Sequence, residues 1–346
     1  MSFVFLSQDL YYFLTLLLGI LCQRKRKRVY TKVNKGGIEM TNVITTENLT
    51  KRYKQQAALN QVNMQIHQGD VYGLIGRNGA GKTTLMKTIC RQIRPTAGKI
   101  RIQGQDVTTK DDSQLRIGTL IEAPGFYPDL TAKQNLDLKC QLYGIRRPGY
   151  IEELLQLVNL SEAKNLKKKT KKFSLGMKQR LGLALALVGD PDILLLDEPT
   201  NGMDPQGIIE FRQTILKLNR ERNITVMISS HILGELSKFI NRIGIINEGN
   251  LVKEADMKEI NDLNRDYIRI NSQNLAELVS HLEESLQISQ MKQVDAQEIR
   301  IYEHLDNPAL ITHELIKAGI LFDQLVVEKS SLEDYYINLT GGSANA

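Results

Sequence analysis

The chain has 346 residues, a length that favours two folding units. Hydrophobic residues make up 42% and charged residues 24% of it, which excludes a fibrous or wholly disordered protein. The formal net charge is +6, but part of the excess lies in two short runs, 24–28 and 167–172, so we expect no nucleic-acid partner. Cys22, Cys90 and Cys140 lack paired or metal-type spacing, which predicts free thiols in the cytoplasm.

Residues 1–39 contain an apolar run, Leu10 to Cys22, followed directly by a basic cluster. The run is shorter than the roughly 20 residues that cross a bilayer, although counting from Phe3 gives a marginal span held by its basic end at the cytoplasmic face. A signal peptide carries its charges before the apolar segment, so secretion is not expected. The other interpretation, which we favour, is a leader outside the functional protein. Translation would then start at Met40, because one choice of synonymous codons for residues 35–39 contains a purine-rich ribosome-binding site at the right distance from Met40.

A predicted strand, Val71 to Ile75, leads into a glycine-rich loop, and a helical pattern begins after it. The loop and the first helical residue, all expected to contact nucleotide, are Gly76, Arg77, Asn78, Gly79, Ala80, Gly81, Lys82, Thr83 and Thr84. Glycines let successive amides point inward and cradle phosphate oxygens at a helix N-terminus. We expect Lys82 to reach the β and γ phosphates and the Thr83 hydroxyl to bind Mg²⁺.

The segment 118–188 has mostly helical periodicity and predicts a helical lobe inserted into an α/β core. Within it, Phe173 to Arg180 opens a helix that continues to Val188.

Farther along, an apolar strand from Asp192 ends in Asp197 and Glu198. Such a run is typical of a strand buried on both faces of a parallel sheet, whose carboxyl end is where ligands bind. We expect Asp197 to hold Mg²⁺, directly or through water, and Glu198 to act as general base. The turn that contains Asp204 is expected to contact the nucleotide, and His231, after a strand at 224–228, to contact the γ phosphate.

Composition changes after about Lys258, where strands and amphipathic helices alternate. They predict a small accessory α+β domain of split βαβ type, 259–346, beside a nucleotide domain at 40–258. No chemistry is apparent in it. A closing helix with a glycine stop is expected at 331–342.

The segment from Phe173 resembles the signature of the ABC ATPase family, Leu-Ser-Gly-Gly-Gln. Ser174 and Gly176 match, whereas Leu175 and Met177 stand where the family has glycine and glutamine. The other motifs follow in family order from about residue 43 to about residue 256. The resemblance implies a P-loop NTPase core and ATP hydrolysis with Mg²⁺. It also implies a head-to-tail dimer, in which the signature of one copy caps ATP on the other, and separate transmembrane permease subunits at the cytoplasmic face of the membrane.

Further expectations rest on the same resemblance. Tyr53 matches the aromatic residue that stacks on adenine, with a strand-edge tyrosine as the alternative. Glu122 occupies the position of the family's glutamine loop and is expected to bind the metal or its water. The segments 121–127 and 173–181 look like the exporters of bacitracin-like and lantibiotic peptides, which implies export of, or immunity to, an antimicrobial peptide or drug. An ABC ATPase acting on ribosomes or DNA is the alternative, disfavoured by one ATPase domain and no sustained heptads.

Overall fold

The largest sheet of the described structure has six strands, in the order β10-β9-β3-β8-β7-β6. The computed structural model describes residues 41–108, 116–162, 166–329 and 332–340, so the predicted leader lies outside the described residues. The strands are β10 (Asn250–Asp256), β9 (Arg242–Asn247), β3 (Val71–Ile75), β8 (Thr225–Ser230), β7 (Ile193–Asp197) and β6 (Ile117–Leu120). Strands β6, β7, β8, β3 and β9 are parallel, and β10 runs antiparallel to β9.

The parallel strands are buried on both faces. In β3, Val71 and Ile75 belong to one apolar cluster, whereas Tyr72 and Leu74 belong to another. In β7, Leu194 belongs to the first cluster, whereas its neighbours Ile193 and Leu195 belong to the second. Because side chains alternate between the faces of a strand, an unbroken apolar run is buried only when both faces are covered. The strands predicted at 71–75 and 192–197 are therefore confirmed.

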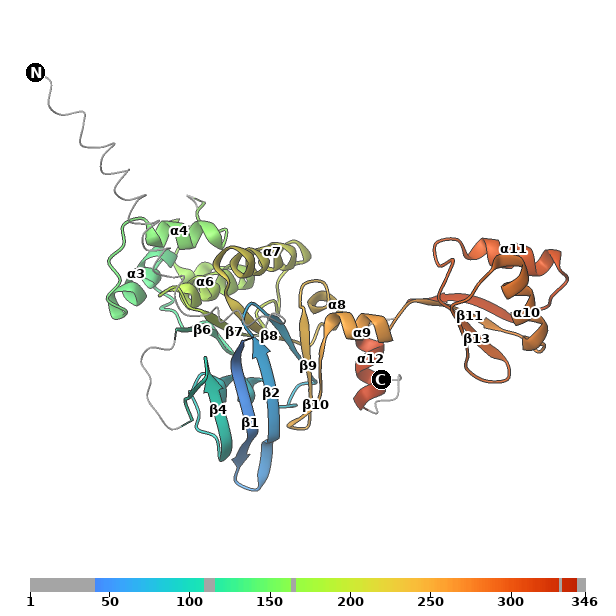
Figure 1. Cartoon of the computed structure of the whole chain (residues 1–346). Helices are drawn as coiled ribbons and strands as arrows, with labels where there is room; N and C mark the ends of the chain where they lie inside the picture. The colour runs from blue at the N-terminus through green and yellow to red at the C-terminus, as the bar shows by residue number, and fades with distance from the viewer. Residues whose placement is uncertain (1–40, 109–115, 163–165, 330–331, 341–346) are drawn as a thin grey trace, which may run out of the picture. The chain divides into compact units, whose positions relative to one another are not determined.

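Different elements cover the two faces (Figure 1). The first apolar cluster includes residues of four helices, α3 (Ala132–Leu142), α4 (Tyr150–Leu157), α6 (Leu175–Leu187) and α7 (Pro205–Arg222). The second lies between the parallel sheet, α2 (Lys82–Ile89) and an antiparallel sheet of order β2-β1-β4-β5. Its strands are β1 (Asn42–Tyr53), β2 (Gln56–His67), β4 (Ala97–Ile102) and β5 (Gln105–Asp106).

The segment 118–188 begins with a strand before its helices. Residues 118–120 lie in β6, which pairs in parallel with β7. A Cβ atom on Gly118 would lie 2.2 Å from the carbonyl oxygen of Ala186 in α6, so glycine allows this strand to lie directly against the helix. The helices of the predicted lobe begin only at Ala132, and a short 3-10 turn, Thr170–Lys172, precedes α6.

The accessory region folds as β11-α10-β12-β13-α11-β14 around an antiparallel sheet of order β12-β13-β11-β14. Its elements are β11 (Tyr267–Asn271), α10 (Leu275–Leu286), β12 (Met291–Gln293), β13 (Glu298–Ile301), α11 (Pro308–Lys317) and β14 (Gln324–Glu328). A separate apolar cluster, which includes Ile268, Leu278 and Ile311, forms its core. This is the split βαβ arrangement that the sequence predicted. The domain boundaries at 39/40 and 258/259 stay predictions.

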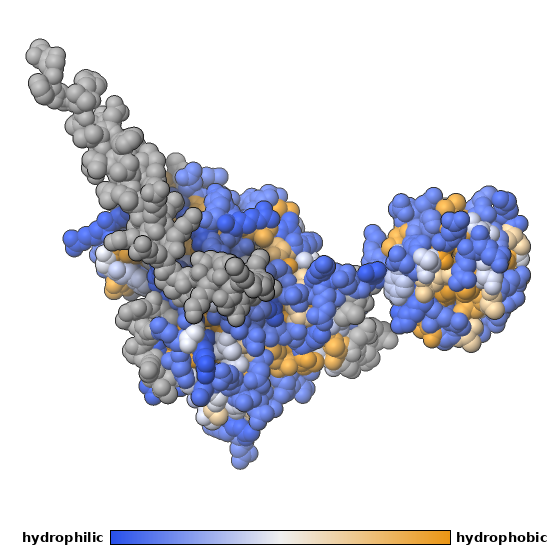
Figure 2. Space-filling view, viewed as in Figure 1, coloured by the Kyte–Doolittle hydropathy of each residue, from blue (hydrophilic) through white to orange (hydrophobic). Residues whose placement is uncertain are grey.

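The described residues also form α8 (Leu233–Leu236), α9 (Met257–Leu263) and α12 (Leu332–Thr340). The expected closing helix is present as α12, and its glycine stop lies outside the described residues. The surface in view in Figure 2 is mainly hydrophilic with small apolar areas. Among the residues that the structure describes, no helix has the length and apolar character to cross a bilayer.

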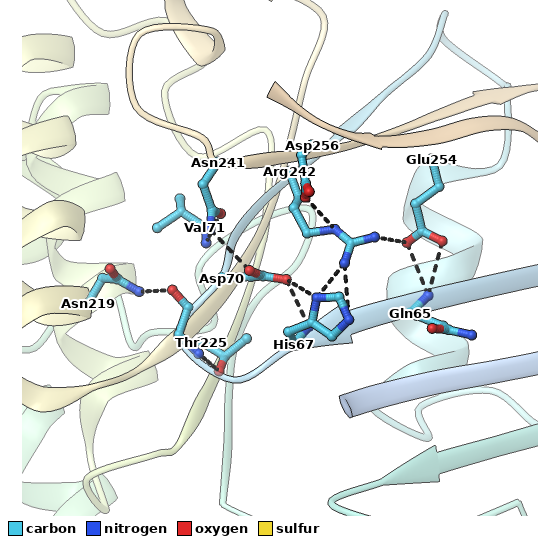
Figure 3. Close-up of polar contacts among 11 residues, drawn as sticks. Gln65, His67, Asp70, Val71, Asn219, Thr225, Asn241, Arg242, Glu254 and Asp256 are labelled. Atoms are coloured by element: carbon cyan, nitrogen blue, oxygen red, sulfur yellow. Dashed lines mark hydrogen bonds and ion pairs between the residues drawn. The ribbon is translucent and has the colours of Figure 1, made fainter. Parts of the chain in front are cut away.

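A polar cluster joins the amino ends of the parallel strands (Figure 3). Arg242, the first residue of β9, contacts the His67 ring, and its Nε lies 3.4 Å from Asp256 Oδ1. The Arg242 guanidinium also lies 4.0 Å from Glu254, and the backbone N–H of His67 donates to Asp70 Oδ2 at 2.8 Å. This cluster lies at the edge of the sheet opposite to the carboxyl ends.

The surroundings of His67 favour the neutral form of its ring. Burial lowers the pKa of His67 below its ordinary 6.5, and the Arg242 guanidinium lowers it further, against the opposing effect of Asp70 and Asp256. Arginine has only donors, so the ring nitrogen that faces it must be an unprotonated acceptor. Protonation of His67 therefore weakens the folded state.

We expect the free energy of unfolding to fall as the pH is lowered from about 7.5 to about 5.5. The unfolded chain takes up a proton on His67 at its ordinary pKa, whereas the folded chain resists it. The contribution of His67 is thus present above pH 6.5 and lost as the pH falls toward the folded-state pKa. Urea denaturation at the two pH values measures the difference.

His67→Gln removes the titrating ring and should show a smaller fall than the wild type. Burial raises the pKa of Glu254, which has the opposite sign, but Glu254 is common to both proteins and cancels in the comparison. An equal fall in both proteins would contradict the role given to His67.

Candidate active site

The glycine-rich loop joins the carboxyl end of β3 to the first residue of α2. A Cβ atom on Gly76 would lie 2.4 Å from the carbonyl oxygen of Ile246, so only glycine fits at the start of the loop. Gly81, the residue before α2, has φ +111°, a conformation that L side chains rarely adopt. Arg77 to Gly79 form the exposed tip of the loop, and the amides at the start of α2 are the donors expected to bind phosphate.

Lys82 lies under this loop and is buried. Its Nζ donates to the carbonyl oxygen of Gly76 at 2.6 Å and to that of Arg77 at 3.3 Å, and it lies 3.4 Å from Glu198 Oε1. The structure thus brings together the loop lysine and the predicted general base, which the sequence separates by more than a hundred positions. The ammonium group supplies positive charge where phosphate is expected.

Asp197 is at the centre of a hydrogen-bond chain at the carboxyl edge of the sheet. The Thr83 hydroxyl donates to Asp197 Oδ2 at 2.7 Å, and the Ser229 hydroxyl donates to Asp197 Oδ1 at 2.7 Å. Ser229 also accepts from the backbone N–H of Glu198 at 2.9 Å. Sequence reasoning missed Ser229 as a site residue, because a serine at a strand end carries no signal of its own. Its parallel register with Asp197 assigns the contact.

Glu198 follows β7 with a left-handed backbone, φ +48°, which turns its side chain toward His231. Its Oε2 lies 2.7 Å from His231 Nδ1 and accepts from the His231 backbone N–H at 3.3 Å. Its Oε1 is buried and makes no hydrogen bond within the described part of the chain. One oxygen is therefore oriented by His231, while the other faces the Lys82 ammonium at 3.4 Å. The prediction that His231 contacts the γ phosphate stays a prediction.

The residues at Thr83 and Asp197 fit a magnesium ion. A hydroxyl and a carboxylate are the hard oxygen ligands that Mg²⁺ prefers, and few protein ligands are needed where phosphates and water complete the shell. In the described ranges, no group of three or more histidine, cysteine, aspartate or glutamate side chains forms a metal cluster.

Glu122 lies elsewhere on the loop after β6 and pairs with α2. Its Oε1 lies 2.5 Å from Nζ of Lys87, and it has φ +61°. No contact between Glu122 and Thr83 or Asp197 occurs among the residues that the structure describes. The predicted role in metal binding therefore stays a prediction, and Lys87, which sequence reasoning did not single out, neutralises the carboxylate.

The signature lies at the start of α6, where Ser174 is the N-cap and its hydroxyl accepts from the backbone N–H of Met177 at 3.3 Å. Leu175, at the family's glycine position, is 50% exposed and packs close to Gly202. Within the described ranges, no contact joins Ser174 or Gly176 to the glycine-rich loop. Ser174 and Leu175 are both exposed at the surface of the described structure.

Two further predicted residues lie apart from this centre. Asp204 is the N-cap residue of α7, which has proline in its first turn. Tyr53 ends β1 and is 50% exposed, with Nζ of Lys51 5.1 Å from its ring centroid. An exposed ring is accessible to a base, and its stacking on adenine stays a prediction.

Comparison with known proteins agrees with this geometry. A family model described as ABC transporter matches residues 59–201. The chain is 41% identical over 304 residues to the bacitracin transport ATP-binding protein BcrA of Bacillus licheniformis, which covers 88% of this chain and 99% of that protein. It is 41% identical over 215 residues to the lantibiotic transport ATP-binding protein SrtF of Streptococcus pyogenes, with coverage of 62% of this chain and 91% of that protein.

Solved structures agree as well. The dimeric ATP-binding cassette MJ0796, in a post-hydrolysis state bound to ADP and phosphate, matches with a TM-score of 0.57 and 28% sequence identity, over 62% of this chain and 98% of that chain. The fold, the order of the motifs and the full-length similarity to curated relatives thus lead to one conclusion. The chain belongs to the ABC transporter family, as an ATP-binding subunit that hydrolyses ATP.

Proposed function

We propose that two copies of this ATPase close head to tail on ATP and drive antimicrobial-peptide export through separate transmembrane subunits at the cytoplasmic face of the membrane. The proposed pairing of two copies rests on the position of the signature. The loop lies beside Asp197 and Glu198, whereas Ser174 is exposed and, among the described residues, makes no contact with the loop. A second copy would supply the missing contact. MJ0796, a related cassette, has been solved as a dimer.

The hydrolysis step follows from the carboxylate geometry. Loop amides and Lys82 bind the β and γ phosphates, and Glu198 Oε1 accepts a proton from a water molecule as its oxygen attacks the γ phosphorus. The bond between the γ phosphorus and the bridging oxygen breaks, which yields ADP and phosphate. His231 holds the other oxygen of Glu198, so that the carboxylate keeps one orientation. Mg²⁺, held by Thr83 and Asp197, would neutralise charge on the phosphates.

The proposed cargo rests on the relatives. Both BcrA and SrtF are described as transport ATP-binding proteins, for bacitracin and for a lantibiotic respectively. The similarity to BcrA extends over the accessory domain, since it covers 88% of this chain. We therefore assign the same class of cargo, a membrane-active peptide antibiotic, to the transporter that contains this subunit.

Glu198→Gln should lower ATP turnover by at least about 100-fold while leaving ATP binding intact, because an amide accepts a hydrogen bond but not a proton at neutral pH. Phosphate release and equilibrium nucleotide binding measure the two effects. Lys82→Ala, in contrast, should lose binding itself. Glu248→Gln, in the exposed turn between β9 and β10, is the matched control and should behave as wild type. Undiminished turnover in Glu198→Gln would exclude Glu198 as the base.

Ser174→Arg, introduced into the Glu198→Gln protein, should abolish ATP-dependent dimer formation, because a long charged side chain would occupy the place of a γ phosphate contact. ATP binding to each monomer should stay unchanged, since Ser174 lies away from the loop of its own chain. Size-exclusion chromatography with light scattering, with and without MgATP, distinguishes the two states. An ATP-dependent dimer that survives Ser174→Arg would refute the head-to-tail arrangement.

Expression of this chain together with its membrane subunits in a sensitive bacterium should raise the minimal inhibitory concentration of bacitracin or of a lantibiotic severalfold. The Glu198→Gln protein, expressed at the same level, should give no protection, because transport requires hydrolysis. If sensitivity to both peptides is unchanged although the protein hydrolyses ATP in vitro, the proposed cargo is wrong. The assignment as an ATPase would not be affected.

A further inference from the structure

The last helix of the chain, α12, packs on the ATPase rather than on the accessory sheet that precedes it. Leu332 and Tyr336, four residues apart and hence on one face of the helix, are 7% and 6% exposed and belong to the apolar cluster of the helix-covered face of the parallel sheet. Leu236 of α8 and Met257 of α9 lie in the same cluster. The chain thus leaves the ATPase after α9, forms the accessory sheet, and returns through α12.

Tyr336 reaches the phosphate-binding loop. Its hydroxyl oxygen accepts a hydrogen bond from the backbone N–H of Arg77 at 3.2 Å. That N–H belongs to the same peptide group as the carbonyl of Gly76, which accepts from Nζ of Lys82 at 2.6 Å. Because a peptide group is planar, its N–H and C=O turn together. Tyr336 and Lys82 therefore hold the two ends of one peptide plane at the start of the loop.

A second contact joins α12 to the segment that follows His231. Glu333 Oε1 accepts from the backbone N–H of Gly234, at the start of α8, at 2.7 Å. One turn of α12 consequently touches the phosphate loop through Tyr336 and the histidine side of the site through Glu333. Both contacts are polar and lie outside the apolar packing of α12. They therefore fix the orientation of α12 relative to the phosphate loop and α8.

We propose that Tyr336 is a positioning residue for ATP binding: its hydroxyl fixes the Gly76–Arg77 peptide, and through it the carbonyl that orients the Lys82 ammonium. The C-terminal segment of the chain is thereby part of the nucleotide-binding machinery. Without the hydroxyl, the peptide can rotate, Lys82 loses a fixed acceptor, and the loop binds phosphate less well. The chemical step depends on Glu198 and is not touched by this contact.

Tyr336→Phe in the full-length protein is the test, because it removes one hydroxyl and keeps the buried ring. We expect the Kd and the KM for MgATP to rise about fivefold, the effect of one ordinary hydrogen bond, with kcat nearly unchanged. Hydrogen exchange of the Arg77 amide should become faster. The thermal unfolding midpoint should stay within about 2 °C of wild type, because the apolar packing is kept.

Tyr335→Phe is the matched control: it removes a hydroxyl from the adjacent residue of α12, and in the described structure Tyr335 makes no hydrogen bond to the phosphate loop. It should leave MgATP affinity and Arg77 exchange at wild-type values. The proposal is overturned if Tyr336→Phe leaves affinity and exchange unchanged, if it lowers only the unfolding midpoint, or if both variants weaken MgATP binding equally.

Discussion

The parallel register of β3, β8 and β7 is the constraint on which the site depends. Asp197 lies opposite Ser229, and Ile75 lies opposite Ser230, so the three strands end at one edge of the sheet. The glycine-rich loop, the two carboxylates and His231 all follow these ends. Since both faces of the strands are buried, a shift in register would move apolar side chains as well as the site. Core packing and catalytic geometry are thus fixed by the same contacts.

At that edge the two carboxylates have different neighbours. Asp197 accepts from two hydroxyls, those of Thr83 and Ser229, which suits a ligand for a divalent ion. Glu198 has one oxygen held by His231, and the other is buried beside the Lys82 ammonium, 3.4 Å away, with no hydrogen bond in the described structure. Between them the backbone turns to positive φ, at Glu198, as the strand ends.

The C-terminal region contacts the ATPase through its last helix, α12, and not through a site in the accessory sheet. The accessory sheet has its own apolar core and no chemistry that we can assign, yet the helix that follows it places Tyr336 and Glu333 against the phosphate loop and α8. Two elements of the ATPase core, α9 and α12, flank the accessory sheet in sequence. The accessory region is thus followed in sequence by a helix that forms a hydrogen bond with the phosphate loop.

The sequence by itself determined the strands, the glycine loop and the identity of Lys82, Asp197 and Glu198, because apolar runs, glycine spacing and strand-end carboxylates are local patterns. It also indicated a small accessory region in which strands and helices alternate, but not β12, the three-residue strand that pairs with β13. It did not reveal Ser229, Lys87 or Tyr336. Each of these acts through a partner distant in the chain, and a serine, lysine or tyrosine has no local pattern that names its partner. Only strand register and helix packing decided those contacts.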